Sequence, residues 1–260
     1  MAAGEKKLTP MMAQYQAIRR SLPEDILLLY RLGDFYEMFF DDAKIAAGIL
    51  NVALTKRHDV PMCGVPHHAA QGYIAKLIRA NKRVAIAEQT SEPVAGKLVD
   101  RGIAQIISAG TIDDLTLLDD TRHNYLAAVY HGGTAKKPCY GLACADHTTG
   151  AFTIAEFPNL QLLEDELTRL SPSELLISDE QVQELSGLKN CQPYDGYAFI
   201  QEQALHTLKD HFKVQSLDGF GCSDMPGAIA AAGGVLHYLT YQLRRNCAHL
   251  RTLSVRNASD

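Results

Sequence analysis

The sequence contains no tryptophan, and aromatic residues make up only 7% of its 260 positions. Charge is also modest, with 25 Lys plus Arg, 30 Asp plus Glu and a charged fraction of 21%. Together with 47% hydrophobic residues, this composition is typical of a globular protein and excludes disorder as the main state. At about 100 to 200 residues per domain, the length predicts two domains.

Long hydrophobic runs are absent as well. The longest, such as 26–30 and 228–234, are far shorter than the roughly 20 residues that a membrane-spanning helix needs. The first residues lack the apolar stretch and small-residue cleavage site of a secretory signal. We therefore expect a cytoplasmic protein that does not cross a membrane.

The six cysteines have no disulfide or zinc spacing, which favours reduced thiols. Their positions are 63, 139, 144, 191, 222 and 247. Cys63 has three histidines nearby, His58, His67 and His68, but this group matches no recognised zinc motif. A small buried cysteine beside a turn is the favoured interpretation, and no metal site is expected.

Three catalytic or nucleotide-binding motifs are also missing from the sequence. It has no glycine loop ending in Lys-Ser or Lys-Thr, no His pair flanking Glu on a helix, and no Ser between glycines after a strand. We therefore expect no ATP site within this chain.

The charge is distributed unevenly. Residues 1–112 hold 14 basic and 11 acidic side chains, whereas residues 113–260 hold 11 and 19. Within 44–87, seven basic side chains accompany a single acidic one, Asp59. This segment is a candidate phosphate-binding surface, although a solvated helix face remains the simpler interpretation.

In the first half, helices alternate with strands, as is typical of an α/β domain. Thr9 as N-cap and Pro10 as first helical residue predict a helix over 10–21 that buries Tyr15, Ile18 and Leu22. The apolar run 26–32 predicts a buried strand. The other expected elements are helices at 41–50 and 69–80 and strands at 52–56, 84–88 and 103–108.

The second half predicts another α/β domain, which begins with three successive antiparallel strands. The polar stretch 113–124 between the halves suits a linker. The expected strands are 125–130, 140–146, 151–157 and 174–178, and the expected helices are 160–170, 199–212 and 228–244.

Directly after the first buried strand comes Gly33-Asp34-Phe35-Tyr36-Glu37, followed by Met38-Phe39-Phe40. Composition alone leaves open whether these aromatic residues belong to the core or to an exposed recognition segment. The order of the residues, however, closely resembles the amino-terminal region of the MutS family of DNA mismatch-recognition proteins. Further matching segments are 9–12, 41–44, 54–57, 61–69, 73–77, 84–89, 111–112, 124–128, 149–150, 172–176 and 230–238.

The resemblance implies that the chain is the amino-terminal third of such a protein. Residues 1–113 would form a mixed-sheet α/β mismatch-binding domain, 114–121 a linker, and 122–260 a connector domain of ribonuclease H-like fold. The implied ligand is double-stranded DNA with mispairs or small insertion/deletion loops, and the connector is expected to dock a MutL-type partner. ATP and Mg would bind only in a carboxy-terminal ATPase domain outside this chain, through which full-length members form homodimers.

The resemblance also assigns residues. Phe35 would stack on the mispaired base and Glu37 would hydrogen-bond to it. The expected backbone or groove contacts are Arg57, Lys56, Lys76, Met62, Pro66 and His67, although the family often has an aromatic residue where this chain has His67. A phosphate contact by Arg57 predicts that Arg57→Ala weakens binding to matched and mismatched DNA about equally and reduces the salt slope by about 1.

A physical mechanism accounts for this pair of residues. An apolar ring that unstacks a base step costs about a few kcal/mol, and less at a mispair that is already poorly stacked. Residues two apart in an extended segment project from one face, so Phe35 and Glu37 can enter the groove together while Tyr36 packs behind. Phosphates and desolvation favour a protonated Glu37, which can donate a hydrogen bond to a base.

Two alternatives remain open. A metal-dependent nuclease of ribonuclease H-like fold would use Asp146 at a strand end, with Glu174 and Asp179 as partners. The turn sequence after Asp146 favours a capping role instead. The other alternative is a fragment whose main role is protein docking.

Overall fold

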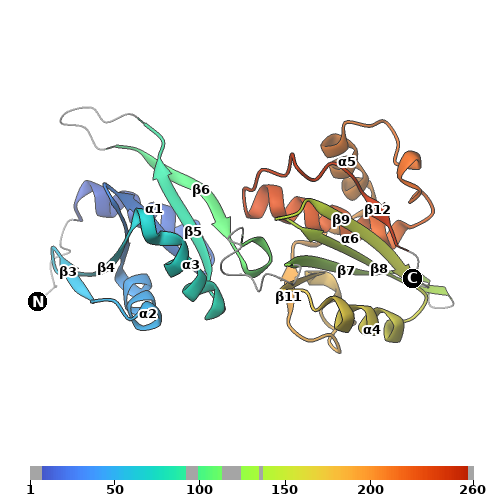
Figure 1. Cartoon of the computed structure of the whole chain (residues 1–260), viewed down its shortest axis with the longest axis horizontal. Helices are drawn as coiled ribbons and strands as arrows, with labels where there is room; N and C mark the ends of the chain where they lie inside the picture. Colours follow the sequence, from blue (N-terminus) through green and yellow to red (C-terminus); the bar gives the residue numbers. More distant parts are fainter. Residues whose placement is uncertain (1–7, 92–98, 113–123, 135–136, 257–260) are drawn as a thin grey trace, which may run out of the picture. The chain divides into compact units, whose positions relative to one another are not determined.

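The computed structural model describes residues 8–91, 99–112, 124–134 and 137–256. The chain divides into two compact units, 1–108 and 109–260 (Figure 1). Each unit has a six-stranded sheet of mixed strand direction with helices packed on it, which confirms the predicted α/β class and the mixed sheet expected in the first unit. The expected linker at 114–121 lies outside the described residues.

In the sheet of the first unit, one parallel strand pair lies among antiparallel pairs. Its strands are β1 (Ile26–Leu32), β2 (Phe35–Phe39), β3 (Thr55–Arg57), β4 (Val60–Pro66), β5 (Arg83–Gln89) and β6 (Arg101–Ile107), in the order β3-β4-β2-β1-β5-β6. Among the described residues of this sheet, only β1 and β5 run parallel. The helices are α1 (Pro10–Arg20), α2 (Phe40–Leu50) and α3 (Ala70–Arg79), the last preceded by a 3₁₀ turn, η1 (His67–Ala69).

Local sequence explains the first elements. Thr9 caps α1 by accepting a hydrogen bond from the amide of Met12, and Pro10 is the first helical residue, as predicted. Tyr15 is buried as expected, but Met12 takes the second buried position while Ile18 and Leu22 are only half-buried. The predicted strand 26–32 coincides with β1.

The two faces of this sheet are covered by different helices. On one face, the Tyr15 ring of α1 packs against Tyr30 of β1 and Phe39 of β2, with ring centroids 5.5 and 5.1 Å apart. On the other face, the Cys63 thiol of β4 lies 3.4 Å from the carbonyl oxygen of Ala43 in α2. Strand β2 therefore lies between two helical layers, and its alternate residues face different layers.

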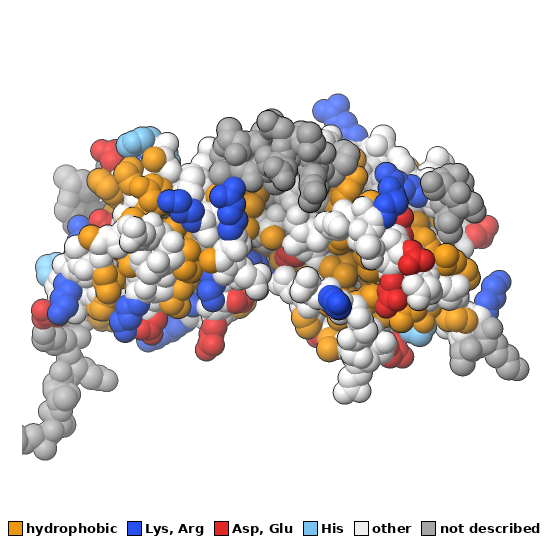
Figure 2. Space-filling model, turned by 60° about the horizontal axis from the view of Figure 1, so that its bottom comes forward, with side chains coloured by type: hydrophobic (Ala, Val, Ile, Leu, Met, Phe, Trp, Pro, Cys, Tyr) orange, Lys and Arg blue, Asp and Glu red, His pale blue; other side chains and the backbone are white. Residues whose placement is uncertain are grey.

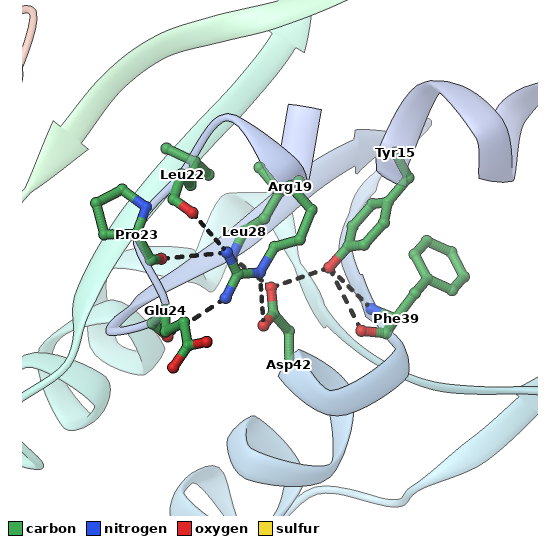
Figure 3. Close-up of polar contacts among 8 residues, drawn as sticks. All are labelled: Tyr15, Arg19, Leu22, Pro23, Glu24, Leu28, Phe39 and Asp42. Carbon is green, nitrogen blue, oxygen red and sulfur yellow. Dashed lines mark hydrogen bonds and ion pairs between the residues drawn. The ribbon is translucent and has the colours of Figure 1, made fainter. Parts of the chain in front are cut away.

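A buried carboxylate connects α1, α2 and β1 (Figure 3). Asp42 accepts hydrogen bonds from the Tyr15 hydroxyl at 3.2 Å, Arg19 Nε at 3.0 Å and the Leu28 amide at 3.0 Å. The Arg19 guanidinium also donates to three backbone carbonyls of the turn after α1, those of Leu22, Pro23 and Glu24. Because three elements meet at one side chain, Asp42 fixes how α1 packs on the sheet.

The second unit begins with the three predicted antiparallel strands, which the structure confirms. The strands are β7 (Tyr125–Thr134), β8 (Lys137–Asp146), β9 (Ala151–Phe157), β10 (Glu174–Ser178), β11 (Cys191–Tyr194) and β12 (Ser254–Val255), in the order β11-β10-β7-β8-β9-β12. Strand β10 pairs parallel with β7, β11 pairs parallel with β10, and β12 pairs parallel with β9. The helices are α4 (Leu160–Leu170), α5 (Gln201–Phe212) and α6 (Pro226–His237).

The helix expected at 228–244 is shorter than predicted, because α6 gives way at Tyr238 to a π-helical turn, 238–242. Among the residues that the structure describes, no helix is long and apolar enough to cross a membrane.

Helix α6 lies against β8 at a glycine–glycine contact. A Cβ atom on Gly141 would lie 2.0 Å from the carbonyl carbon of Gly227, so no side chain fits there. Glu156 of β9 accepts hydrogen bonds from the amides of Gly227 and Ala228, at 2.6 and 3.1 Å, and thus caps the first turn of the helix. This arrangement allows backbone to approach backbone closely.

We predict that Gly141→Ala destabilises the second unit by about 3 kcal/mol, the upper part of the range for overpacking, because the clash is with backbone. Gly219→Ala is a suitable control, since a Cβ there meets nothing within 4 Å. Urea unfolding of both variants checks the prediction, which fails if the two midpoints agree.

Candidate nucleic-acid interface

Phe35 lies at the tip of a tight hairpin between β1 and β2. Leu32 pairs with Phe35, so the loop consists of Gly33 and Asp34 alone, and Gly33 has a φ of +56° that favours glycine. The Phe35 side chain is 47% exposed, whereas the rest of β2 is buried. The aromatic ring is therefore exposed at the turn, while the strand that follows it is buried.

The hairpin tip is held from two sides. The amide of His67 in η1 donates to the carbonyl oxygen of Asp34 at 2.8 Å, and Arg31 Nε donates to that of Gly33 at 2.5 Å. Tyr36 packs behind Phe35, as the alternation predicts, with its ring centroid 5.3 Å from that of His67. Its hydroxyl bonds to Glu88 of β5. These contacts fix the backbone that carries Phe35.

Five of the eight residues assigned by resemblance lie on one face of the sheet. Phe35 pairs with Pro66, Glu37 with Gly64, and Phe39 with Met62. Strand β3 continues this face with Thr55 opposite Met62 and Arg57 opposite Val60. Because directly paired residues point to the same side, the face gathers Phe35, Glu37, Arg57, Met62 and Pro66.

Glu37 does not project freely from this face. Its Oε2 atom lies 2.6 Å from Arg57 Nη1, and the two side chains are 12% and 40% exposed. Burial raises the pKa of the Glu37 carboxyl above its ordinary value, and the nearby Arg57 guanidinium partly offsets that rise. Phe35 and Glu37 do lie on one face, as the alternation predicts, but the β3–β4 hairpin brings a cation to Glu37 that pairs with it.

The other three assigned residues lie elsewhere. By alternation Lys56 points to the opposite side from Arg57, and Lys76 lies exposed in α3, 5.5 Å from the Tyr73 ring. His67 is exposed at the start of η1, next to the hairpin tip. The structure thus does not gather Lys56 and Lys76 with the Phe35 face.

The excess of basic residues at 44–87 does not form one patch. Lys44 is paired with Asp41 at 2.8 Å and Arg83 with Asp25 at 2.7 Å. On the face drawn in Figure 2, the Lys and Arg side chains of the first unit are interspersed with hydrophobic, uncharged and acidic groups. On this face, phosphate contacts would therefore come from cations that lie among other groups and not from a continuous basic surface.

The cysteine group considered for metal binding consists of one buried thiol and exposed histidines. Cys63 is 1% exposed and burial raises the pKa of its thiol to about 11, so it stays protonated. His58, His67 and His68 are exposed. Within the described residues no three His, Cys, Asp or Glu side chains come together as metal ligands, and all six cysteines are free.

Asp146 is buried at the end of β8 and caps a turn. Its Oδ1 atom accepts hydrogen bonds from the amides of Thr148 and Thr149, at 3.0 and 3.2 Å. Glu174 instead accepts from the Tyr238 hydroxyl and the Gly110 amide, and Asp179 from the Gly196 amide. The three carboxylates considered for a nuclease site thus each serve a different part of the second unit.

Comparison with known proteins gives matches along most of the chain. A family model described as MutS domain I matches residues 9–116, and one described as MutS domain II matches residues 124–251. A DNA mismatch repair protein MutS from Syntrophobacter fumaroxidans is 43% identical over 260 residues, covering 95% of this chain and 29% of that protein. One from Treponema denticola is 39% identical over 273 residues, covering 98% and 30%. The chain therefore spans about 30% of the length of these relatives.

Proposed function

Because the chain belongs to the MutS family and contains its domains I and II, we propose that it recognises mispaired bases and small insertion/deletion loops in double-stranded DNA. The observation that carries the proposal is the half-exposed Phe35 ring at the tip of a hairpin whose following residues are buried. A ring that served only the core would not lie in solvent on so rigid a support.

In the proposed mechanism, Phe35 enters the minor groove and unstacks one base step. The energy needed is smaller at a mispair or an unpaired base, so affinity depends on how easily the duplex deforms. Met62 and Pro66 lie on the same face as the ring and would contact the walls of the groove, with His67 beside the hairpin tip. Lys56 and Lys76 would contact backbone phosphates from other surfaces of the unit.

Glu37 would contribute a hydrogen bond to the mispaired base as a protonated acid. Burial already raises the pKa of its carboxyl in the unbound protein, although Arg57 partly offsets that effect. DNA phosphates would raise the pKa further, because negative charge disfavours the carboxylate. Binding therefore takes up a proton at pH values between the pKa of the free protein and that of the complex.

The sign of the pH dependence follows from that pKa difference. The affinity for a G·T duplex is expected to rise as pH falls through the window, by up to tenfold per pH unit, and to level off below the free-protein pKa. Fluorescence anisotropy at fixed salt, at pH 5.5 to 8.5, measures this with G·T and matched duplexes. Glu37→Gln is expected to flatten the profile and to bind matched DNA more tightly. An unchanged, sloped profile in Glu37→Gln would contradict the assignment.

For the second unit we propose the role of a connector with a ribonuclease H-like fold, occupying residues 122–260. Three antiparallel strands with β10 and β11 added parallel beside β7 support that fold. We also propose that this unit docks a MutL-type partner. ATP and Mg would act in a carboxy-terminal domain of the longer protein, where homodimers form, so this part of the protein would not itself be an enzyme.

A further inference from the structure

The ion pair between Glu37 and Arg57 joins two residues for which the proposed function needs different partners. Glu37 would bond to a base, and Arg57 to a phosphate, yet in the unbound protein their side chains bond to each other at 2.6 Å. When DNA arrives, the guanidinium can either bind a phosphate through its other N–H groups and keep Glu37, or give up Glu37 for the phosphate. The pair must therefore either persist in the complex or be exchanged for DNA.

The geometry of the pair favours exchange. Within the described part of the chain, the guanidinium makes only this hydrogen bond, through Nη1, and its side chain is 40% exposed. The Glu37 carboxylate uses only Oε2 in the same way, within a side chain that is 12% exposed. The Arg57 side chain is thus partly in solvent and has further N–H donors that bond to no described protein atom. Glu37 has a second carboxylate oxygen, Oε1, that is not used in the pair.

Among the residues that the structure describes, no second cation is placed to hold Glu37 once Arg57 leaves. Its cross-strand neighbour on β1 is Tyr30, whose hydroxyl bonds to Gln14 of α1. Arg101 of β6 lies over the Tyr30 ring, 5.0 Å from its centroid, and bonds to backbone carbonyls. Among charged groups, Arg57 alone offsets the effect of burial on the pKa of the Glu37 carboxyl. Removing Arg57 would leave that buried carboxylate without an ion-pair partner.

We propose that Arg57 is a phosphate-triggered positioning residue, which holds Glu37 in the unbound protein and releases it toward the mispaired base when a backbone phosphate takes its guanidinium. This inference rests on the proposed function and extends it. A guanidinium suits such an exchange, since it binds carboxylate and phosphate with similar geometry. Glu37 would be freed only where the phosphate backbone is already in place, so its charge would not oppose the first approach to DNA.

The exchange changes what Arg57→Ala should do. When Arg57→Ala is made in the wild-type background, the variant loses the phosphate contact, but it also no longer has to break the ion pair with Glu37 on binding. The second effect partly offsets the first. In the Glu37→Gln background that offset is absent. We therefore expect Arg57→Ala to weaken binding to a G·T duplex at least about threefold more in the Glu37→Gln background than in the wild type, a coupling typical of residues in contact. A simple phosphate contact, as the sequence alone predicts, would give the same loss in both backgrounds.

The test is a double-mutant cycle on the 260-residue chain, with binding measured by fluorescence anisotropy at stated low salt on G·T and matched duplexes. Lys56→Ala, one residue away and exposed, is the matched control and is expected to be additive with Glu37→Gln. The pH profile is the second measurement. Arg57→Ala is expected to take up fewer protons on binding than the wild type, whereas Lys56→Ala is expected to leave proton uptake unchanged.

A measurement without DNA separates the two proposals. The ¹³C chemical shift of the Glu37 carboxyl, followed through a pH titration, should move to a higher pKa in Arg57→Ala and stay near the wild-type value in Lys56→Ala. Additive Arg57 and Glu37 substitutions, with Phe35→Ala still removing the mispair preference, would overturn the exchange alone. If the wild type shows no preference for mispaired over matched DNA, the proposed function is wrong, whatever the titration gives.

Discussion

Replacing Phe35 by alanine is expected to abolish the preference for mispaired over matched DNA. Stacking of a base on an aromatic side chain is worth about 1–3 kcal/mol, so affinity for a G·T or one-base-loop duplex should fall about 5- to 150-fold. Matched DNA should bind almost as before, because no ring is inserted where unstacking is too costly. Anisotropy with labelled G·T, one-base-loop and matched duplexes at the same salt measures the ratio.

The structure offers a close control for this substitution. Leu54 precedes β3 in the same unit and is 50% exposed, against 47% for Phe35, so Leu54→Ala removes similar exposed apolar surface away from the hairpin tip. We expect Leu54→Ala to keep the preference. Phe35→Leu separates ring stacking from bulk, since a leucine can wedge but not stack. Equal ratios in wild type and Phe35→Ala would contradict the proposed wedge.

Strands and helices with a clear local signal could be predicted from the sequence. The continuous apolar run of β1 and the capped start of α1 are properties of a few adjacent residues, and both elements lie where expected. Strand β4 was missed because Pro61, Gly64 and Pro66 interrupt any strand pattern. Strand β4 forms because it pairs with β2 along its length, for example Cys63 with Met38, and this pairing is a tertiary effect.

The site was predictable only in part, for the same reason. The exposure of Phe35 follows from its place beside the two-residue turn, which Gly33 signals. The ion pair of Glu37 with Arg57 could not be predicted in this way. It joins residues 20 apart in the chain, which the register of two hairpins brings together. Family resemblance assigned both residues to DNA without indicating that they bind each other first.

The second large effect concerns stability. Asp42→Ala is expected to lower the free energy of unfolding of the first unit by about 3 kcal/mol, because removing one member of a buried pair leaves the others without a partner. Asp42 is 4% exposed, and its loss would strand Arg19 Nε and the amide of Leu28 (Figure 3). The Tyr15 hydroxyl would keep only its contacts with the backbone of Phe39.

Asp41→Ala is the matched control, one residue earlier in the same helix. Its side chain is 84% exposed and pairs only with Lys44, so we expect a change within about 0.5 kcal/mol. Urea unfolding of both variants gives the difference, and hydrogen exchange at the Leu28 amide reports the lost bond directly. Equal unfolding midpoints would show that the Asp42 contacts add no net stability.

The Asp42 variant also bears on how the recognition hairpin is supported. Tyr15, oriented by Asp42, bonds to the amide and carbonyl of Phe39 at the end of β2, four residues from Phe35. If rigid support of β2 matters for insertion, Asp42→Ala should lose mispair preference well below its unfolding temperature, while Asp41→Ala keeps it. If the preference instead survives until the first unit unfolds, the β1–β2 turn and its His67 contact are sufficient to hold the ring in place.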